Sequence, residues 1–176
     1  VLVATLLIVA LQVAEGRRAA YATAFAAVAA ILQDPEIRDA RWHVLNVLGQ
    51  HKDKDADGAE VEVPKKEFDC WSSVDRALAG KVCQSYDTAA IVCRRGMLPP
   101  DVVADSWGHS LRHVLPIVQP LIDEFQRDRA PEYWDDFVWI ADLADRQPWL
   151  HRSWIGRARV KIGDLVGGET RLRKHL

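Results

Sequence analysis

Hydrophobic positions are concentrated at the start of the chain. In residues 1–13 the only polar side chains are Thr5 and Gln12. A helix needs about 20 residues to cross the hydrocarbon core of a bilayer, so this run is too short to do so alone. We therefore expect residues 1–16 to be the C-terminal part of a truncated transmembrane helix whose beginning precedes Val1.

Two arginines follow the apolar run and indicate its orientation. Arg17 and Arg18 stand where the positive-inside rule places basic residues on the cytoplasmic face. This predicts a single-pass protein of the inner (cytoplasmic) membrane, with the rest of the chain in the cytoplasm. Two alternatives stay open, an ordinary core helix of a soluble protein and the remains of a secretion signal, although no small-x-small cleavage site precedes a polar segment.

The next segments have the period of α-helices. Residues 17–33 are rich in alanine and place large side chains on one stripe, which predicts a connecting helix. The stripe consists of Tyr21, Phe25, Val28 and Leu32. Asp34 suits an N-cap and Pro35 suits the first helical position, so a second helix is expected from there to Gly49.

A third helix is expected between a serine cap and a glycine stop. It begins after Ser72 or Ser73 and ends at Gly96. Its apolar stripe predicts that Val74 is buried, whereas Asp75 lies on the opposite, solvent-facing side.

Prolines delimit the last two helices. One is expected from Pro100, with kinks at Pro116 and Pro120, and another from Pro131 to Pro148. Because no segment shows sustained period-2 alternation, we predict an all-α fold. After the N-terminal transmembrane helix, residues 34–148 would form a small cytoplasmic bundle of about four to five helices.

Length, charge and cysteine content narrow the class of protein. The chain has 176 residues, enough for one domain with a core, and its formal net charge of -2 gives no overall attraction to nucleic acid. Three cysteines cannot all pair within one chain, and their spacing fits neither CxxC nor a zinc motif. Reduced thiols are therefore favoured over a disulfide framework.

A polar loop is expected over residues 50–68. It contains the first half of a calcium-binding pattern, in Asp53, Asp55, Asp57 and Gly58. The twelfth position, which should carry a bidentate carboxylate, is Pro64. The sequence therefore favours a solvated linker over a calcium site.

Residues 149–176 form a basic C-terminal tail. From His151 onward there are seven Lys or Arg residues and two acidic ones. Such a segment can contact anionic lipid, to which each basic residue contributes about 1 kcal/mol. Nucleic acid is less favoured, because only Trp149 and Trp154 are available for stacking on bases. A tail that only aids solubility is the alternative.

One group of residues could have a chemical function. Asp105, His109 and His113 are spaced by four, which puts a carboxylate and two imidazoles along one side of a helix, where they could bind zinc or iron. Histidines hydrogen-bonded at the margin of an apolar stripe explain the pattern equally well. No phosphate-binding Gly-rich loop and no GxSxG elbow occurs, so no cofactor and no catalytic residue is predicted.

Several short motifs together resemble a known family. They comprise Pro35, Glu36, Ala40 and Arg41; Trp71, Ser72 and Asp75; Cys83, Tyr86 and Asp87; Arg94 to Leu98; Trp107 and Gly108; and Tyr133, Trp134 and Phe137. Residues 34–146 thereby resemble an uncharacterised bacterial domain of unknown function, found in membrane-anchored proteins with one N-terminal spanning helix. The resemblance implies an anchored helical domain and supplies no chemistry.

These observations favour a non-catalytic, membrane-tethered interaction or accessory subunit. Its protein partner would contact tryptophans at the domain surface, for which the candidates are Trp42, Trp139, Trp149 and Trp154. The alternative is a metal-dependent enzyme that uses Asp105, His109 and His113.

Overall fold

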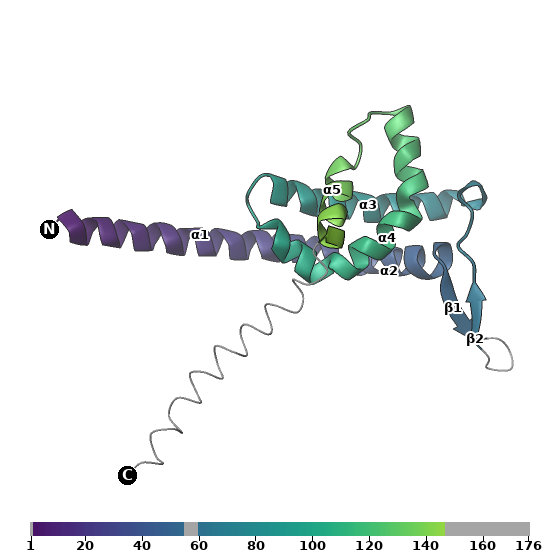
Figure 1. The fold of residues 1–176 in the computed structure, drawn as a ribbon, viewed down its shortest axis with the longest axis horizontal. Helices are drawn as coiled ribbons and strands as arrows, with labels where there is room; N and C mark the ends of the chain where they lie inside the picture. The colour runs from purple at the N-terminus through teal and green to yellow at the C-terminus, as the bar shows by residue number, and fades with distance from the viewer. Residues whose placement is uncertain (1, 55–59, 147–176) are drawn as a thin grey trace, which may run out of the picture.

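The computed structural model describes residues 2–54 and 60–146. In this part of the chain five α-helices confirm the expected helical bundle (Figure 1). The elements are α1 (Leu2–Leu32), α2 (Pro35–His43), the π-helical turn η1 (Val44–Leu48), β1 (His51–Lys54), β2 (Glu60–Val63), the 3-10 turn η2 (Phe68–Cys70), α3 (Ser73–Arg94), α4 (Pro100–Asp128) and α5 (Asp135–Arg146).

The helix α1 is continuous and only its C-terminal end belongs to the body. Val28 and Leu32 are fully buried. Every side chain described from Thr5 to Thr23 is exposed, and Figure 1 shows this part of α1 projecting away from the other helices. The apolar run and the alanine-rich segment therefore share one helix.

Within the described residues, no helix combines the length and the apolar character that crossing a membrane requires. The transmembrane helix expected at residues 1–16 is thus not present as a complete span. The physical reason is that three charged residues, Glu15, Arg17 and Arg18, enter α1 directly after its apolar run.

The start of α2 confirms the predicted cap. The Asp34 carboxylate accepts hydrogen bonds from the backbone N–H groups of Glu36 (2.8 Å) and Ile37 (3.4 Å). The helix then continues as the wider π-helical turn η1, which ends at Gly49. A Cβ atom at Gly49 would lie 2.7 Å from Cδ1 of Ile117, so glycine is what allows η1 to approach α4.

A β-hairpin replaces part of the loop expected at residues 50–68. β1 and β2 pair antiparallel, with His51 opposite Val63 and Asp53 opposite Val61. Asp53 therefore lies in a strand rather than in a calcium-binding loop, and residues 55–59 lie outside the described part of the chain. The alternation of EVEV was too short for the sequence pattern to indicate a strand.

The helix α3 occupies the centre of the bundle, in contact with α1, α2, α4 and α5. The ring of Tyr86 stacks on that of Phe137 from α5, with centroids 5.2 Å apart. The Tyr86 hydroxyl donates to Ser110 of α4 (2.7 Å) and accepts from Arg41 of α2 (3.3 Å). One aromatic residue thus contacts three other helices.

The helix α4 changes direction along its length (Figure 1), as Pro116 and Pro120 predict. Pro120 lacks an N–H group and cannot donate to the carbonyl of Pro116, four residues earlier. Nζ of Lys65 donates to that carbonyl oxygen instead, at 2.6 Å. The lysine that follows β2 therefore satisfies an acceptor that the kink leaves open.

The helix α5 begins later than predicted, at Asp135 instead of Pro131. Residues 131–134 form turns, and Trp134 has a left-handed backbone with φ of 58°. This conformation costs roughly 1–3 kcal/mol for a non-glycine residue. The Trp134 ring is buried, where it stacks on Phe125 at 4.7 Å, and this burial offsets the cost.

Truncation of Phe137 tests the packing of α5 on α3. We expect Phe137→Ala to lower the free energy of unfolding by about 3–5 kcal/mol, because it leaves a cavity beside Tyr86. Val74, predicted to be buried, is 62% exposed, so that prediction is wrong and Val74→Ala is a suitable control. Its unfolding midpoint in urea should stay near that of the parent protein, and equal losses in both variants would contradict this account of the core.

Candidate functional site

The three residues considered as metal ligands lie on α4, which brings the two histidines together but not all three residues. The exposed rings of His109 and His113 lie 4.1 Å apart. Asp105 precedes His113 by eight residues, about 12 Å along the helix axis, which is too far for one ion to bind both. No group of three or more His, Cys, Asp or Glu residues that could hold a metal occurs in the described ranges 2–54 and 60–146.

A different polar cluster lies where α2, the segment after β2 and α3 meet. Asp75 was expected to face solvent, but its side chain is buried. Its carboxylate accepts from Nε2 of His43 (2.7 Å), from Nζ of Lys66 (2.8 Å), and from the backbone N–H and hydroxyl of Ser72 (2.8 and 2.9 Å). These contacts close the α3 capping box and bind α2 to it.

The hydrogen bonds decide the charge of Asp75. Burial by itself raises the pKa of this carboxyl, but the bonds from Lys66, His43 and Ser72 outweigh burial and hold the pKa well below its usual range. A carboxylate that orients a histidine can support a general base. Here Lys66 binds the same carboxylate, so the arrangement is typical of an ion pair that joins segments.

The two buried cysteines, Cys83 and Cys93, offer no activated nucleophile. Burial raises the pKa of the Cys93 thiol to about 11 and raises that of Cys83 further. A thiol in this state is protonated at neutral pH and unreactive. Cys70 is exposed, and all three described cysteines are free.

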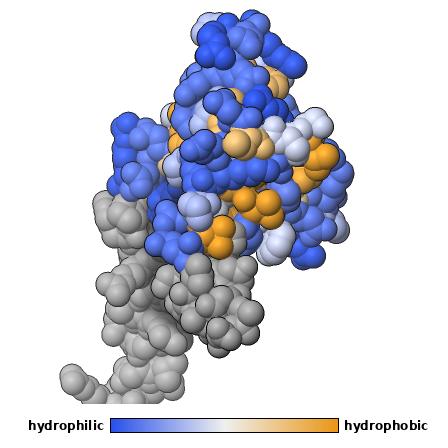
Figure 2. Space-filling view, turned by 90° about the vertical axis from the view of Figure 1, so that its right-hand side faces the viewer, coloured by the Kyte–Doolittle hydropathy of each residue, from blue (hydrophilic) through white to orange (hydrophobic). Residues whose placement is uncertain are grey.

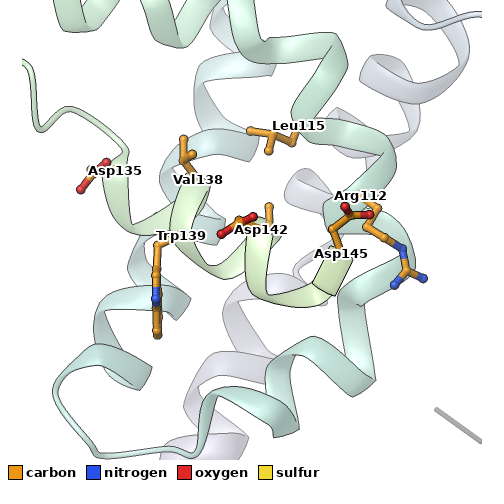
Figure 3. Close-up of a pocket in the computed structure, with 8 residues that line it drawn as sticks. Arg112, Leu115, Asp135, Val138, Trp139, Asp142 and Asp145 are labelled. Carbon is orange, nitrogen blue, oxygen red and sulfur yellow. The ribbon is translucent and has the colours of Figure 1, made fainter. Parts of the chain in front are cut away.

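A pocket of about 540 Å³ lies between α4 and α5 (Figure 3). Trp139 lines it, and Asp135 and Asp145 stand toward its two ends. Three of its four charged side chains, those of Arg112, Asp135 and Asp142, are engaged with neighbours. NH1 of Arg112 donates to the carbonyl of Ala144 (2.9 Å), and Arg146 forms an ion pair with Asp142 on the same helix. The pocket combines apolar side chains with charges that are largely paired, which is typical of a contact surface.

The candidate tryptophans differ in exposure. Trp42 on α2 is 62% exposed, as a partner-binding residue should be. Trp139 is half-buried, with the Arg94 guanidinium 5.0 Å from its ring centroid. Trp149 and Trp154 lie outside the described residues.

The largest apolar exposure lies on the projecting part of α1. Leu6 is 65% exposed and Leu11 58%, and Ile8, Val9 and Val13 are exposed by about half. The alternative of a core helix is therefore wrong for the side chains described between Thr5 and Val13, which are all exposed. By contrast, the face at the hairpin end (Figure 2) is mostly hydrophilic, with hydrophobic side chains in small groups between polar ones.

A groove of about 780 Å³ opens where α1 leaves the body. One wall is the stretch of α1 from Arg17 to Ala27, and the other is the turn between α3 and α4, at Gly96 and Met97. Gly96 has φ of 71°, a left-handed conformation that favours glycine. The apolar projection and this groove form the candidate functional surface.

Comparison with protein families supports the assignment made from short motifs. The family model described as Domain of unknown function (DUF4760) matches residues 1–144. The chain belongs to the DUF4760 family. The match includes the apolar start of α1, so that segment is part of the family's domain. Among curated proteins and solved structures, none is significantly similar to this DUF4760 chain.

Sequence reasoning missed the Asp75 cluster for a physical reason. The pattern from Ser72 to Asp75 did indicate a helix cap. His43 and Lys66 approach only after α2 and the hairpin have folded, and neither is spaced in the sequence to suggest that contact. The signal available was a charged residue at the third position of a helix, beside the apolar Val74.

Removal of the Asp75 charge should destabilise the protein. We expect Asp75→Asn to cost about 2–3 kcal/mol, because an amide cannot accept from both cations and Ser72. Asp69→Asn, at an exposed position before α3, is the control and should change stability by less than about 0.5 kcal/mol. Equal midpoints for both variants in chemical denaturation would contradict this role.

The same carboxyl predicts a pH dependence. Its pKa is lower in the folded than in the unfolded state, so its contribution is complete above the unfolded pKa of about 3.9 and declines as pH falls below that value. The parent protein should therefore lose stability more steeply than Asp75→Asn below about pH 4.

Proposed function

We propose that this DUF4760 protein is a non-catalytic helical interaction module, held at a membrane by the apolar N-terminal part of α1. The observation that carries the proposal is the exposure of five large aliphatic side chains between Leu6 and Val13. Transfer of such side chains from water to an apolar medium is favourable by about 1.5–3 kcal/mol each when complete. For partly exposed side chains the sum is on the order of 5 kcal/mol.

The apolar side chains surround α1 rather than marking one stripe. Leu6, Ile8, Val9 and Leu11 point in different directions around a helix with 100° per residue. A helix that is apolar on all sides suits lipid better than a groove in one protein partner. This supports a bilayer as the environment of residues 2–14.

The arginines that follow the apolar part of α1 support an orientation of the protein in the membrane. Arg17 and Arg18 would lie among the lipid headgroups, which puts the body in the cytoplasm and makes the protein a single-pass component of the inner membrane. A full crossing would need further apolar residues ahead of residue 1, so the experiments use the complete gene product.

The body would then present a contact surface to a protein partner. Trp42 is the most exposed large aromatic side chain of the body, and aromatic residues are enriched in interface cores. The basic tail at residues 149–176 would add contacts with anionic lipid. A metal-dependent enzyme has less support, because Asp105 is too far from His113 to share an ion.

Charge substitutions in the apolar segment test the tether. The complete protein should sediment with membranes and resist extraction by alkaline carbonate. Leu6→Asp combined with Val9→Asp should release most of it, because an acidic residue in the middle of the hydrocarbon core costs about 3 kcal/mol. Ala22→Asp with Ala26→Asp places two charges on exposed positions of the same helix and should leave the protein in the membrane. Wild-type protein that stays in the supernatant without detergent would refute the tether.

The exposed thiol of Cys70 reports the orientation. A membrane-impermeant maleimide should leave the protein unlabelled in intact cells and label it after lysis. Cys70→Ser is the control and should abolish labelling, because Cys83 and Cys93 are buried. Labelling of Cys70 in intact cells would place the body on the outer side.

A further inference from the structure

We propose that the turn between α3 and α4 forms a second membrane contact, which binds anionic phospholipid headgroups together with the arginines of α1. This inference rests on the proposed tether and adds the lipid class and the residues that recognise it. The surface consists of Arg17, Arg18, Arg95 and Met97, and we call it the headgroup surface.

The position of the turn is the first argument. The turn flanks α1 from Arg17 onward, on the side toward which the apolar part of the helix projects (Figure 1). If Ala14 ends the apolar segment, Arg17 lies about 5 Å beyond it along the axis, which is the depth of the headgroup layer. A tilt of about 20°, usual for spanning helices, brings one side of the body closer still.

The charge of this surface is the second argument. Arg17, Arg18 and Arg95 are all exposed, and none forms an ion pair with another described residue. Arg94, one position earlier, differs because it is paired with Asp135 and Asp136 at the start of α5. The unpaired arginines are complementary to a surface of lipid phosphates.

The third argument is the apolar residue at the tip of the turn. Met97 is 48% exposed although the neighbouring Leu98 is buried. A flexible thioether among arginines suits the interfacial headgroup layer. The groove behind it is lined by no acidic residue, so nothing along its described walls repels phosphate.

Met97 is the single methionine among the 176 residues, and the methyl signal that is lost in Met97→Leu identifies it in the complete protein. The complete protein, labelled with methyl-13C methionine, is incorporated into nanodiscs of phosphatidylcholine alone or of an equimolar mixture with phosphatidylglycerol. Spin-labelled lipid in the discs broadens nearby methyl signals. We expect strong broadening of the Met97 signal in the mixed discs and much less in phosphatidylcholine alone.

Substitutions of the arginines distinguish recognition of lipid charge from simple proximity of Met97 to the bilayer. Arg95→Gln and the pair Arg17→Gln with Arg18→Gln should each return the broadening in mixed discs toward the value in phosphatidylcholine. Arg127→Gln, on the far end of α4 where Arg127 is paired with Asp128, should leave it unchanged. Circular dichroism of each variant confirms that the helices persist.

The outcomes distinguish this inference from the tether. Protein that does not co-elute with either type of disc would refute the tether itself. Protein that co-elutes with both types of disc but shows the same Met97 signal in each would refute the headgroup surface alone. Broadening that survives both arginine substitutions would also refute it, because lipid charge would then play no part.

Discussion

The helix α1 is much longer than the part of it that the body buries, and the other features of the structure depend on this difference in length. α1 has 31 residues, yet full burial begins only at Val28. Before Val28 only partial contacts, such as that of the Phe25 ring with Trp107, join α1 to the body, and the other end of the helix is apolar. Helix propensity alone contributes little to the stability of a helix in water. The projecting part of α1 is therefore stabilised when its apolar side chains are covered by something other than the body. A lipid environment would supply that cover without a second protein chain.

α1 leaves the body beside α3, and α2 packs on the same helix. The chain reverses at Asp34, and α2 packs on α3 immediately afterward. Three residues of α2 bind α3: Glu36 is paired with Lys81, Arg41 donates to Tyr86, and His43 donates to Asp75. The exposed pair contributes little energy, whereas the buried Asp75 contributes more because its carboxylate would otherwise lack partners. The polar cluster thus holds α2 and the segment after β2 against the start of α3.

Local signals in the sequence were sufficient to predict the helices but not the contacts between them. The caps at Asp34 and Ser72 and the prolines of α4 depend on neighbours within a few residues, so their spacing predicted the boundaries. Trp134 shows the limit, because its left-handed backbone is stabilised by stacking on Phe125 and cannot be inferred from the Pro131 signal. The same holds for Asp75, which a helical wheel places in solvent. The exposed apolar segment of α1 was predictable, since its composition exceeds what this small body can bury.

A continuous helix has a mechanical consequence that a flexible linker would not have. From Arg18 to Val28 the helix advances by ten residues, about 15 Å of rigid rise. If the arginines lie among headgroups, the part of the body around Val28 is held at that fixed height and with a fixed rotation about α1. Trp42 is then presented at a constant orientation relative to the membrane, which limits its partners to proteins whose own docking surface lies at the same height. This restriction is a source of specificity for a module without an evident reaction centre in its described part. A partner that is also held at the membrane loses less rotational freedom when it binds, because the orientation of Trp42 is already fixed.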